Sequence, residues 1–472
     1  MTINQKRAPL YEALYQFSQG EPISFHVPGH KNGKIFSRQG EALFKHVLSL
    51  DVTELTGLDD LHEPTGVIHE AQQLSSDWFG ADDTFFLVGG STVGNLAMIL
   101  STSSRGDKVI VQRNCHKSIL NGLELAGVKP IFVASIFQKD RNRYVGPSVD
   151  QVIKAIKEHP EAKSVILTYP DYFGMVFPLE EIIRIAHSVQ MPVLIDEAHG
   201  VHFSTHPIFP KSSLELGADI VIQSAHKMAP AMTMGAYLHV RSSLVVKENI
   251  AYYLQLLQSS SPSYPILASL DLARHFLANQ KVEVIHDVHK SVKKVKNILS
   301  NGLFWNILES DDPLKIILQV NKGYNGREVA YLFEQEKIYP ELSTHDQLLF
   351  IHGLEPFENW SFLSNAIDNI VERLKLMPNH ATIEEIQIPQ ESIQMLRFSY
   401  DDMKNKAVTL RSLDRSIGCV AAEAVVPYPP GIPLIVKGEV VTETHIKAIH
   451  FLLDKEINFQ NRNIKQGFKT FK

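Results

Sequence analysis

Three short stretches of the chain carry residue types that could act together in catalysis. GGSTVGN (89–95) follows the apolar run TFFLV, Asp196 follows PVLI, and Lys227 closely follows DIVIQ. Because each apolar run has the length and composition of a buried strand, each polar group is expected at the end of a core element. A buried ammonium or carboxylate requires a partner.

The glycine-rich stretch has the composition of a phosphate-binding turn. A strand-to-helix turn exposes unpaired backbone N–H groups at the positive end of the helix dipole, and Ser91 and Thr92 add hydroxyl donors. The stretch lacks the lysine of a P-loop and the GxGxxG spacing of a dinucleotide site. The alternative is a tight turn in which Ser or Thr only caps the helix.

Asp196 is placed where open α/β sheets present ligand groups. Its carboxylate would suit a protonated ring nitrogen, although a simple turn cap is the alternative. The next residue, Glu197, is expected to point the other way. His199 and His202 do not reproduce the helical spacing of a zinc protease, so no metal site is expected.

Lys227 completes the set, because a partly desolvated lysine has a lowered pKa and can form a Schiff base with a carbonyl. Taken alone, it could equally be a surface lysine beyond the strand. A phosphate cradle, a carboxylate and a lysine at the ends of parallel strands are together what pyridoxal 5'-phosphate requires: the cradle holds the phosphate, the acid protonates the ring nitrogen and the amine holds the aldehyde.

His116 follows the apolar run KVIVQ and could stack on the face of a pyridine ring. The alternative is a histidine at a helix start, hydrogen bonded to backbone. Its neighbour Cys115 is expected to be a small core residue rather than a nucleophile.

The elements that must position these residues form an α/β pattern. Apolar runs alternate with segments of helical period such as VDQVIKAIKEH and LEEIIRIAHSV, which predicts a mainly parallel sheet covered on both faces. The apolar runs expected as its strands are TFFLVGG, KVIVQ, KPIFVAS, SVILTYP, PVLIDEAH and DIVIQSAHK. We expect this large cofactor-binding domain to span residues 51–285.

Three further regions are expected around it. Residues 1–50 hold an amphipathic helix and the arm FHVPGHKNG, and residues 286–390 form a smaller α/β domain with helices around the strands LKIILQVN and QLLFIHG. Residues 391–472 form a C-terminal domain. In this last region MLRFSYD leads into a helical stretch, the prolines of VVPYPPGIPLIVKGEVVT favour an extended path, and a closing helix precedes a polar tail.

Composition excludes several classes of protein. The 472 residues are 44% hydrophobic and 21% charged, typical of a folded globular protein, and the formal charge of -6 argues against nucleic acid or an anionic membrane as main partner. With only Cys115 and Cys419, no disulfide framework is expected. Neither a signal-peptide core nor a membrane-spanning apolar stretch occurs, so a cytoplasmic location is expected.

With GGSTVGN, DEAHGVHF and QSAHK, the chain resembles the ornithine/lysine/arginine decarboxylases of prokaryotes, pyridoxal-phosphate enzymes of the aspartate-aminotransferase fold type. The likeness covers most of the chain, because FHVPGHKNG, TELTGLDDLHEPTGVI, SSSPSYPILASLD and AAEAVVPYPPGIPLIVKGE look like family stretches in family order. PYPPGIP is the most specific of these. The chain resembles the short form, which lacks the N-terminal wing domain.

The resemblance implies a role for each site residue. Lys227 would bind the aldehyde, Asp196 the ring nitrogen, and His116 would stack on the ring. The other expected cofactor contacts are Ser91, Thr92, Ala198, His199, Ser224, His226 and, from a neighbouring subunit of at least a dimer, Ser260 in SSSPSY. His30, Lys31 and Glu423 would lie close to substrate.

The reaction implied is decarboxylation of arginine, lysine or ornithine to a polyamine-type amine and carbon dioxide, and the likeness to the short form favours arginine. Acidic residues of GLDDLHE (Asp59, Asp60, Glu63) could hold the cationic side chain, or could form a solvated turn. One alternative is an aminotransferase in which Arg397 holds an α-carboxylate. Another is a non-catalytic regulatory protein, which would ordinarily carry an added DNA-binding domain.

Overall fold

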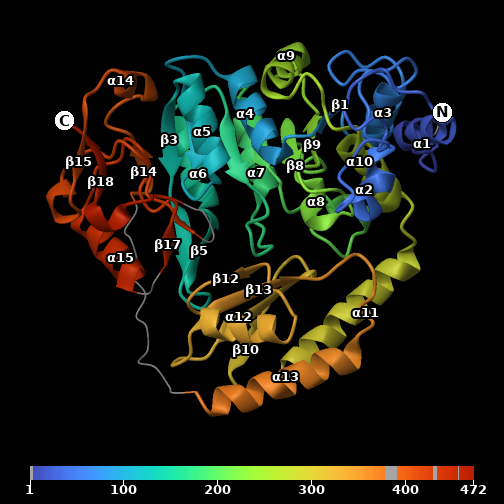
Figure 1. The fold of residues 1–472 in the computed structure, drawn as a ribbon. Coiled ribbons are helices and arrows are strands. Elements are labelled where there is room, and N and C mark those ends of the chain that lie inside the picture. Colours follow the sequence, from blue (N-terminus) through green and yellow to red (C-terminus); the bar gives the residue numbers. More distant parts are fainter. Residues whose placement is uncertain (1–3, 378–390, 429–432, 455–456) are drawn as a thin grey trace.

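The structure is a computed structural model that describes residues 4–377, 391–428, 433–454 and 457–472. Its centre is an eight-stranded sheet in the order β1-β9-β8-β7-β6-β2-β3-β14 (Figure 1). The strands are β1 (Asp83–Leu87), β9 (Ala236–Val240), β8 (Ile220–Gln223), β7 (Val193–Asp196), β6 (Val165–Thr168), β2 (Lys108–Gln112), β3 (Lys129–Val133) and β14 (Ile393–Met395). The strands expected from the apolar runs are all present.

The sheet is mainly parallel, as predicted. Strands β8, β7, β6, β2 and β3 pair in parallel, whereas β9 is antiparallel to both β8 and β1. Two antiparallel pairings in succession restore the direction, so β1 runs the same way as β8. The carboxyl ends of β1, β7 and β8 therefore lie at one edge of the sheet.

Helices cover both faces of this sheet. Along β2, Val109 and Val111 join one buried cluster with α4 and α5, while Ile110 joins the cluster on the opposite face. This alternation is what a strand buried on two sides requires. The helices of this domain are α3 (Val67–Phe79), α4 (Gly90–Thr102), α5 (Lys117–Ala126), α6 (Val149–Glu158), α7 (Leu179–Ser188), α8 (Ala225–Met228), α9 (Lys247–Leu257) and α10 (Tyr264–Ala278). A hairpin of β4 (Ser135–Gln138) and β5 (Arg143–Pro147) extends from it.

A second, antiparallel sheet lies below the first in Figure 1. Its strands are β10 (Trp305–Leu308), β11 (Lys315–Val320), β13 (Gln347–Ile351) and β12 (Leu342–Ser343), and its helices are α11 (Val282–Leu299), α12 (Gly326–Gln335) and α13 (Trp360–Lys375). The two strands and two helices expected here are present. We propose domain boundaries near residues 50, 285 and 390.

The helical stretch expected after MLRFSYD is present as the short helix α14 (Tyr400–Lys404), which β15 (Val408–Arg411) follows. One expectation for the C-terminal region was wrong. The supposed polar tail ends in β18 (Phe468–Phe471), which pairs with β15 because Phe468 and Phe471 are buried. The closing helix α15 (Glu443–Asp454) and the short pair β16 (Pro427–Tyr428) and β17 (Asn458–Phe459) complete the region. Residues 429–432 of PYPPGIP lie outside the described residues.

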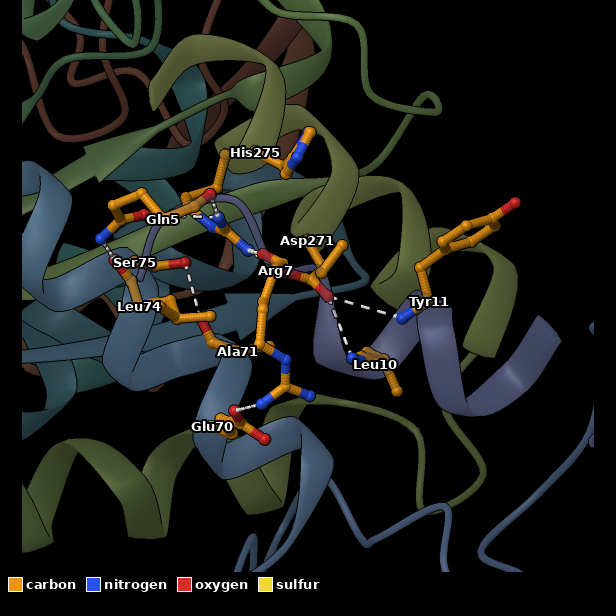
Figure 2. Close-up of polar contacts among 12 residues, drawn as sticks. Gln5, Arg7, Leu10, Tyr11, Glu70, Ala71, Leu74, Ser75, Asp271 and His275 are labelled. Atoms are coloured by element: carbon orange, nitrogen blue, oxygen red, sulfur yellow. Dashed lines mark hydrogen bonds and ion pairs between the residues drawn. The ribbon is translucent and has the colours of Figure 1, made fainter. Parts of the chain in front are cut away.

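The N-terminal segment contains α1 (Pro9–Gln19) and α2 (Glu41–Leu48), the second of which was not predicted. It is attached to α10 by hydrogen bonds to a buried ion pair of that helix, Asp271 with Arg274, and Figure 2 shows Asp271 beside Leu10 and Tyr11. Asp271 accepts from the Leu10 backbone N–H at 3.0 Å, and Arg274 donates to the backbone oxygens of Gln5 at 2.9 Å and Arg7 at 2.6 Å. Because both charged side chains are fully buried, each requires the other.

Within the described residues, none of the helices is both long enough and apolar enough to cross a bilayer.

We expect Arg274→Met to lower the free energy of unfolding by about 3–5 kcal/mol, because it leaves the Asp271 carboxyl buried without its partner. Urea denaturation followed by circular dichroism measures the change. The matched control is Lys290→Ala, which removes an exposed ion pair with Asp287 and should cost less than about 1 kcal/mol. Equal losses in the two variants would contradict the role of the buried pair.

Candidate active site

The buried carboxylate predicted at the end of β7 is present. Asp196 is only 2% exposed, and its oxygens accept from Asn95 Nδ2 at 3.0 Å and from the Ala198 backbone N–H at 3.2 Å. Both partners are neutral, and no cation from the described residues is hydrogen bonded to it. The adjacent Glu197 points away from the site, as expected, toward Ser213 and Gln223.

Lys227 lies in α8, the single helical turn that follows β8. It is half-buried, so the alternative of a surface lysine is wrong. Its Nζ is 3.2 Å from His199 Nε2 and 5.7 Å from the centre of the Tyr172 ring. Burial lowers the pKa of Lys227, and the carboxylates of Asp196 and Glu341 oppose that shift.

His116 is the residue that caps the start of α5. Its Nδ1 accepts from the Ser118 backbone N–H at 3.2 Å, so the helix-start alternative describes its backbone contact correctly. Burial lowers the pKa of His116, and Lys227 adds to the shift while Asp196 opposes it. A neutral ring that accepts at Nδ1 carries its hydrogen on Nε2.

Asn95 connects these groups and was not predicted as a site residue. Its Nδ2 donates both to Asp196 and, at 2.8 Å, to Ser118 Oγ, which in turn contacts His116 Nδ1 at 2.8 Å. Asn95 is 1% exposed in the interior of α4. The signal that could have identified it is a polar residue on the apolar face of a helix that follows GGSTVG.

The predicted phosphate cradle forms the turn between β1 and α4. Gly90 has a φ of +74°, which favours glycine, and Ser91 Oγ lies 2.8 Å from Ser224 Oγ. A Cβ on Gly94 would lie 2.8 Å from Leu87 and 2.9 Å from Ile222, so this glycine lets α4 pack closely on the sheet. Nearby, His226 Nδ1 donates to the Gly235 carbonyl at 3.0 Å. Thr92 is exposed beside Ser91.

Four predicted residues contact neither the turn between β1 and α4 nor Lys227 or Asp196 within the described part of one chain. His30 Nε2 donates to Asp51 at 3.1 Å, and Lys31 Nζ donates to the His26 carbonyl at 2.5 Å. Glu423 accepts from the Lys469 backbone N–H at 2.8 Å and lines a cleft of about 370 Å³ beside α5. Ser260 is exposed. Their expected roles near substrate or in a neighbouring subunit stay predictions.

The acidic turn GLDDLHE has a structural role at Asp59. The Asp59 carboxylate accepts from the backbone N–H groups of Gly66 at 2.8 Å and Ile68 at 3.0 Å, at the start of α3. These backbone donors lower the pKa of Asp59 although burial raises it. Asp59 therefore caps the start of α3, and the expected contact of this turn with a cationic side chain stays a prediction.

The donor set fits pyridoxal phosphate. The N–H groups and hydroxyls at the start of α4 suit a phosphate, and Lys227 offers an amine for an aldehyde. The buried Asp196 carboxylate has only neutral partners, so it suits a protonated ring nitrogen. These are three different chemical requirements, each met at the end of a different strand.

Comparisons with known proteins agree with this fold. Residues 8–311 match the model of the Orn/Lys/Arg decarboxylase major domain, and residues 383–463 match that of its C-terminal domain. The chain is 40% identical to the uncharacterized protein YaaO of Bacillus subtilis, over 97% of each chain. It is 33% identical to the arginine decarboxylase of the same species, over 97% of this chain and 96% of that protein.

A likeness to solved structures extends to the whole fold. The constitutive lysine decarboxylase of Escherichia coli superimposes with a TM-score of 0.81 over 99% of this chain and 82% of that chain, at 19% sequence identity. Serine palmitoyltransferase from S. paucimobilis, a structure with bound PLP, superimposes over 72% of this chain with a TM-score of 0.54. The chain belongs to the Orn/Lys/Arg decarboxylase family.

Proposed function

We propose that this chain is a pyridoxal-phosphate-dependent decarboxylase that converts a basic amino acid to its amine and carbon dioxide. The observation that carries the proposal is the Asp196 carboxylate, buried with neutral partners at the end of β7 beside the amine of Lys227. A buried carboxylate in that position serves to keep a heterocyclic nitrogen protonated. Relatives named arginine decarboxylase and lysine decarboxylase support the reaction class.

Each residue would have a separate task. Pyridoxal phosphate, when bound, supplies a sink for the electron pair left at Cα as carbon dioxide departs. Asp196 would hold a proton at the ring nitrogen, Lys227 would hold the aldehyde carbon, and His116 would lie on the ring face. The phosphate would be bound by the backbone and hydroxyls of Ser91 and Thr92, with Ser224 and His226 beside them. Lys227 or His199 would return a proton to Cα.

Arginine is the substrate we favour. The arginine decarboxylases of Bacillus subtilis and Bacillus anthracis are each 33% identical to this chain and are aligned with 97% of it. The named lysine decarboxylases are aligned at 22–24% identity. Near the amine of Lys227, the carboxylate of Glu341 accepts from the Tyr172 hydroxyl at 2.5 Å, which places negative charge where a cationic side chain could use it.

We further propose a cytoplasmic enzyme of polyamine formation, built of at least two copies. The N-terminal arm supports the assembly, because Ile23, Phe25 and Leu43 are 82%, 94% and 84% exposed in one chain. Apolar side chains this exposed on one segment indicate a surface that a second copy covers. Ser260, exposed in SSSPSY, would reach the phosphate of the neighbouring site.

Purified protein given pyridoxal phosphate and arginine should release carbon dioxide and the corresponding amine, identified by mass, faster than with lysine or ornithine. Lys227→Ala and Asp196→Asn should each lower kcat by on the order of 10³-fold, since one removes the amine and the other the charge that holds the ring proton. Lys211→Ala, at a 66% exposed lysine, is the control and should leave the rate unchanged. Formation of a keto acid with an acceptor would identify an aminotransferase instead.

The shared site has its own test. Ser260→Asp places a negative charge where the neighbour's phosphate would bind, and Lys227→Ala removes the amine, so each variant alone should be inactive. A mixed dimer contains one site with neither change, so a co-expressed population, half of it mixed dimers if subunits pair at random, should recover up to about one quarter of the wild-type rate. Full activity of Ser260→Asp, or no recovery in mixed dimers that sedimentation shows to have formed, would contradict a phosphate site shared between subunits.

A further inference from the structure

A second lysine lies behind Lys227. Lys315, the first residue of β11, is fully buried, and it was not predicted to have any role. Its Nζ has two polar contacts, with His199 Nδ1 at 3.1 Å and with Met228 Sδ at 3.5 Å. A buried amine is costly to keep as a simple structural group, so these contacts require an explanation.

The ring of His199 joins the two lysines. Its Nδ1 faces Lys315, and its Nε2 faces Lys227 at 3.2 Å. Burial lowers the pKa of His199 well below its usual range, and the two lysines add to the shift, so the ring is neutral. A neutral imidazole has one N–H and one lone pair. The lysine at the N–H must therefore accept, which only a free amine can do, while the lysine at the lone pair donates, as an ammonium where nearby carboxylates compensate the charge.

The surroundings of Lys315 favour the ammonium there. Asp312 is fully buried, and one of its oxygens has no hydrogen-bond partner among the described residues. Burial raises the pKa of Asp312, but His202, 3.2 Å away, outweighs this and lowers it, so Asp312 is ionised. Burial lowers the pKa of Lys315 to about 8, and Lys227 adds to this shift while Asp312, Glu341 and Asp171 oppose it. At neutral pH the amine is still protonated.

The surroundings of Lys227 favour the free amine whenever Asp196 is paired with the cofactor ring and the aldehyde is not held by Lys227. Among the carboxylates that raise the pKa of Lys227, Asp196 has the largest effect and Glu341 the next largest. The inference rests here on the proposed function, in which Asp196 pairs with the ring nitrogen and no longer compensates a charge on Lys227. The other titratable neighbours are His199 and His116. The proton then stays on Lys315, whose charge Asp312 compensates, rather than on Lys227.

Packing holds this arrangement across the two sheets. Lys315 belongs to the second sheet, whereas His199 follows β7 of the first. Gly174, at a φ of +84°, lets its loop press on the lysine stem, because a Cβ there would lie 2.7 Å from Lys315 Cγ. The Tyr172 ring packs against the His199 ring with 4.4 Å between centres.

We propose that Lys315 is a positioning residue: its ammonium donates to His199 Nδ1, which turns the Nε2–H toward Lys227 and keeps Lys227 a free amine able to attack an aldehyde. The same contacts can return a proton. The Nε2–H bond breaks as a new N–H bond forms on Lys227, and an N–H bond of Lys315 breaks as one forms at Nδ1. One proton leaves Lys315, one arrives at Lys227, and the ring stays neutral.

The test compares two variants whose charge at residue 315 is known. Lys315→Met has no charge, and Lys315→Arg is always a cation. In full-length, cofactor-free protein, trace acetylation of Lys227 by acetic anhydride is followed by mass spectrometry across pH. The pH midpoint for Lys315→Arg should be at least about one unit below that for Lys315→Met, a tenfold difference in labelling at low pH. Wild type should lie between them, at least about half a unit below Lys315→Met.

If Lys315 had only a structural role, the two variants would not move the pH midpoint of Lys227 labelling in opposite directions from that of wild type. Lys322→Met, which removes an exposed lysine just beyond β11, is the matched control and should label as wild type. An Arg midpoint equal to or above the Met midpoint would overturn the proposal. If thermal melts show that Lys315→Arg does not fold, a Met midpoint at or below that of wild type overturns it. Labelling requires no decarboxylation, so it tests the role of Lys315 even if the activity assay contradicts the proposed function.

Discussion

The site depends on one electrostatic constraint, the burial of the Asp196 carboxylate. A charge at 2% exposure with neutral hydrogen-bond partners is held at a cost of several kcal/mol unless a cation joins it. The surrounding groups are arranged around that requirement. Asn95 fixes one oxygen and, through Ser118, orients His116, while Lys227 lies close enough for the carboxylate to influence its amine.

The sheet explains how residues far apart in the chain meet. Strands β1, β7 and β8 run in one direction and end at one edge, so the turn after each strand delivers a different group. The second sheet then closes the site from another side with Lys315 and the Tyr172–Glu341 contact. The amine of Lys227 is thus influenced by Asp196 of the first sheet and is connected through His199 to Lys315 of the second.

Much of the fold was predictable from sequence, because short apolar runs between helical segments indicate a covered parallel sheet. The polar residues at the ends of these runs indicated the candidate site. Asn95 and Lys315 were missed for a physical reason. Each is a polar residue inside an apolar pattern, and only tertiary contacts distinguish such a residue from a tolerated exception. The strand β18 was missed because the burial of Phe468 depends on pairing with β15, which is distant in sequence. The roles expected for His30, Glu423 and Ser260 stay predictions, because none of the three contacts Lys227 or Asp196 within the described part of one chain.

The most direct measurement is reductive trapping. Protein loaded with pyridoxal phosphate is treated with borohydride, digested, and searched by mass spectrometry for the phosphopyridoxyl group. The account predicts the label on the peptide that contains Lys227, with none on the peptide that contains Lys315. A label at Lys315, or on exposed lysines alone, would contradict it.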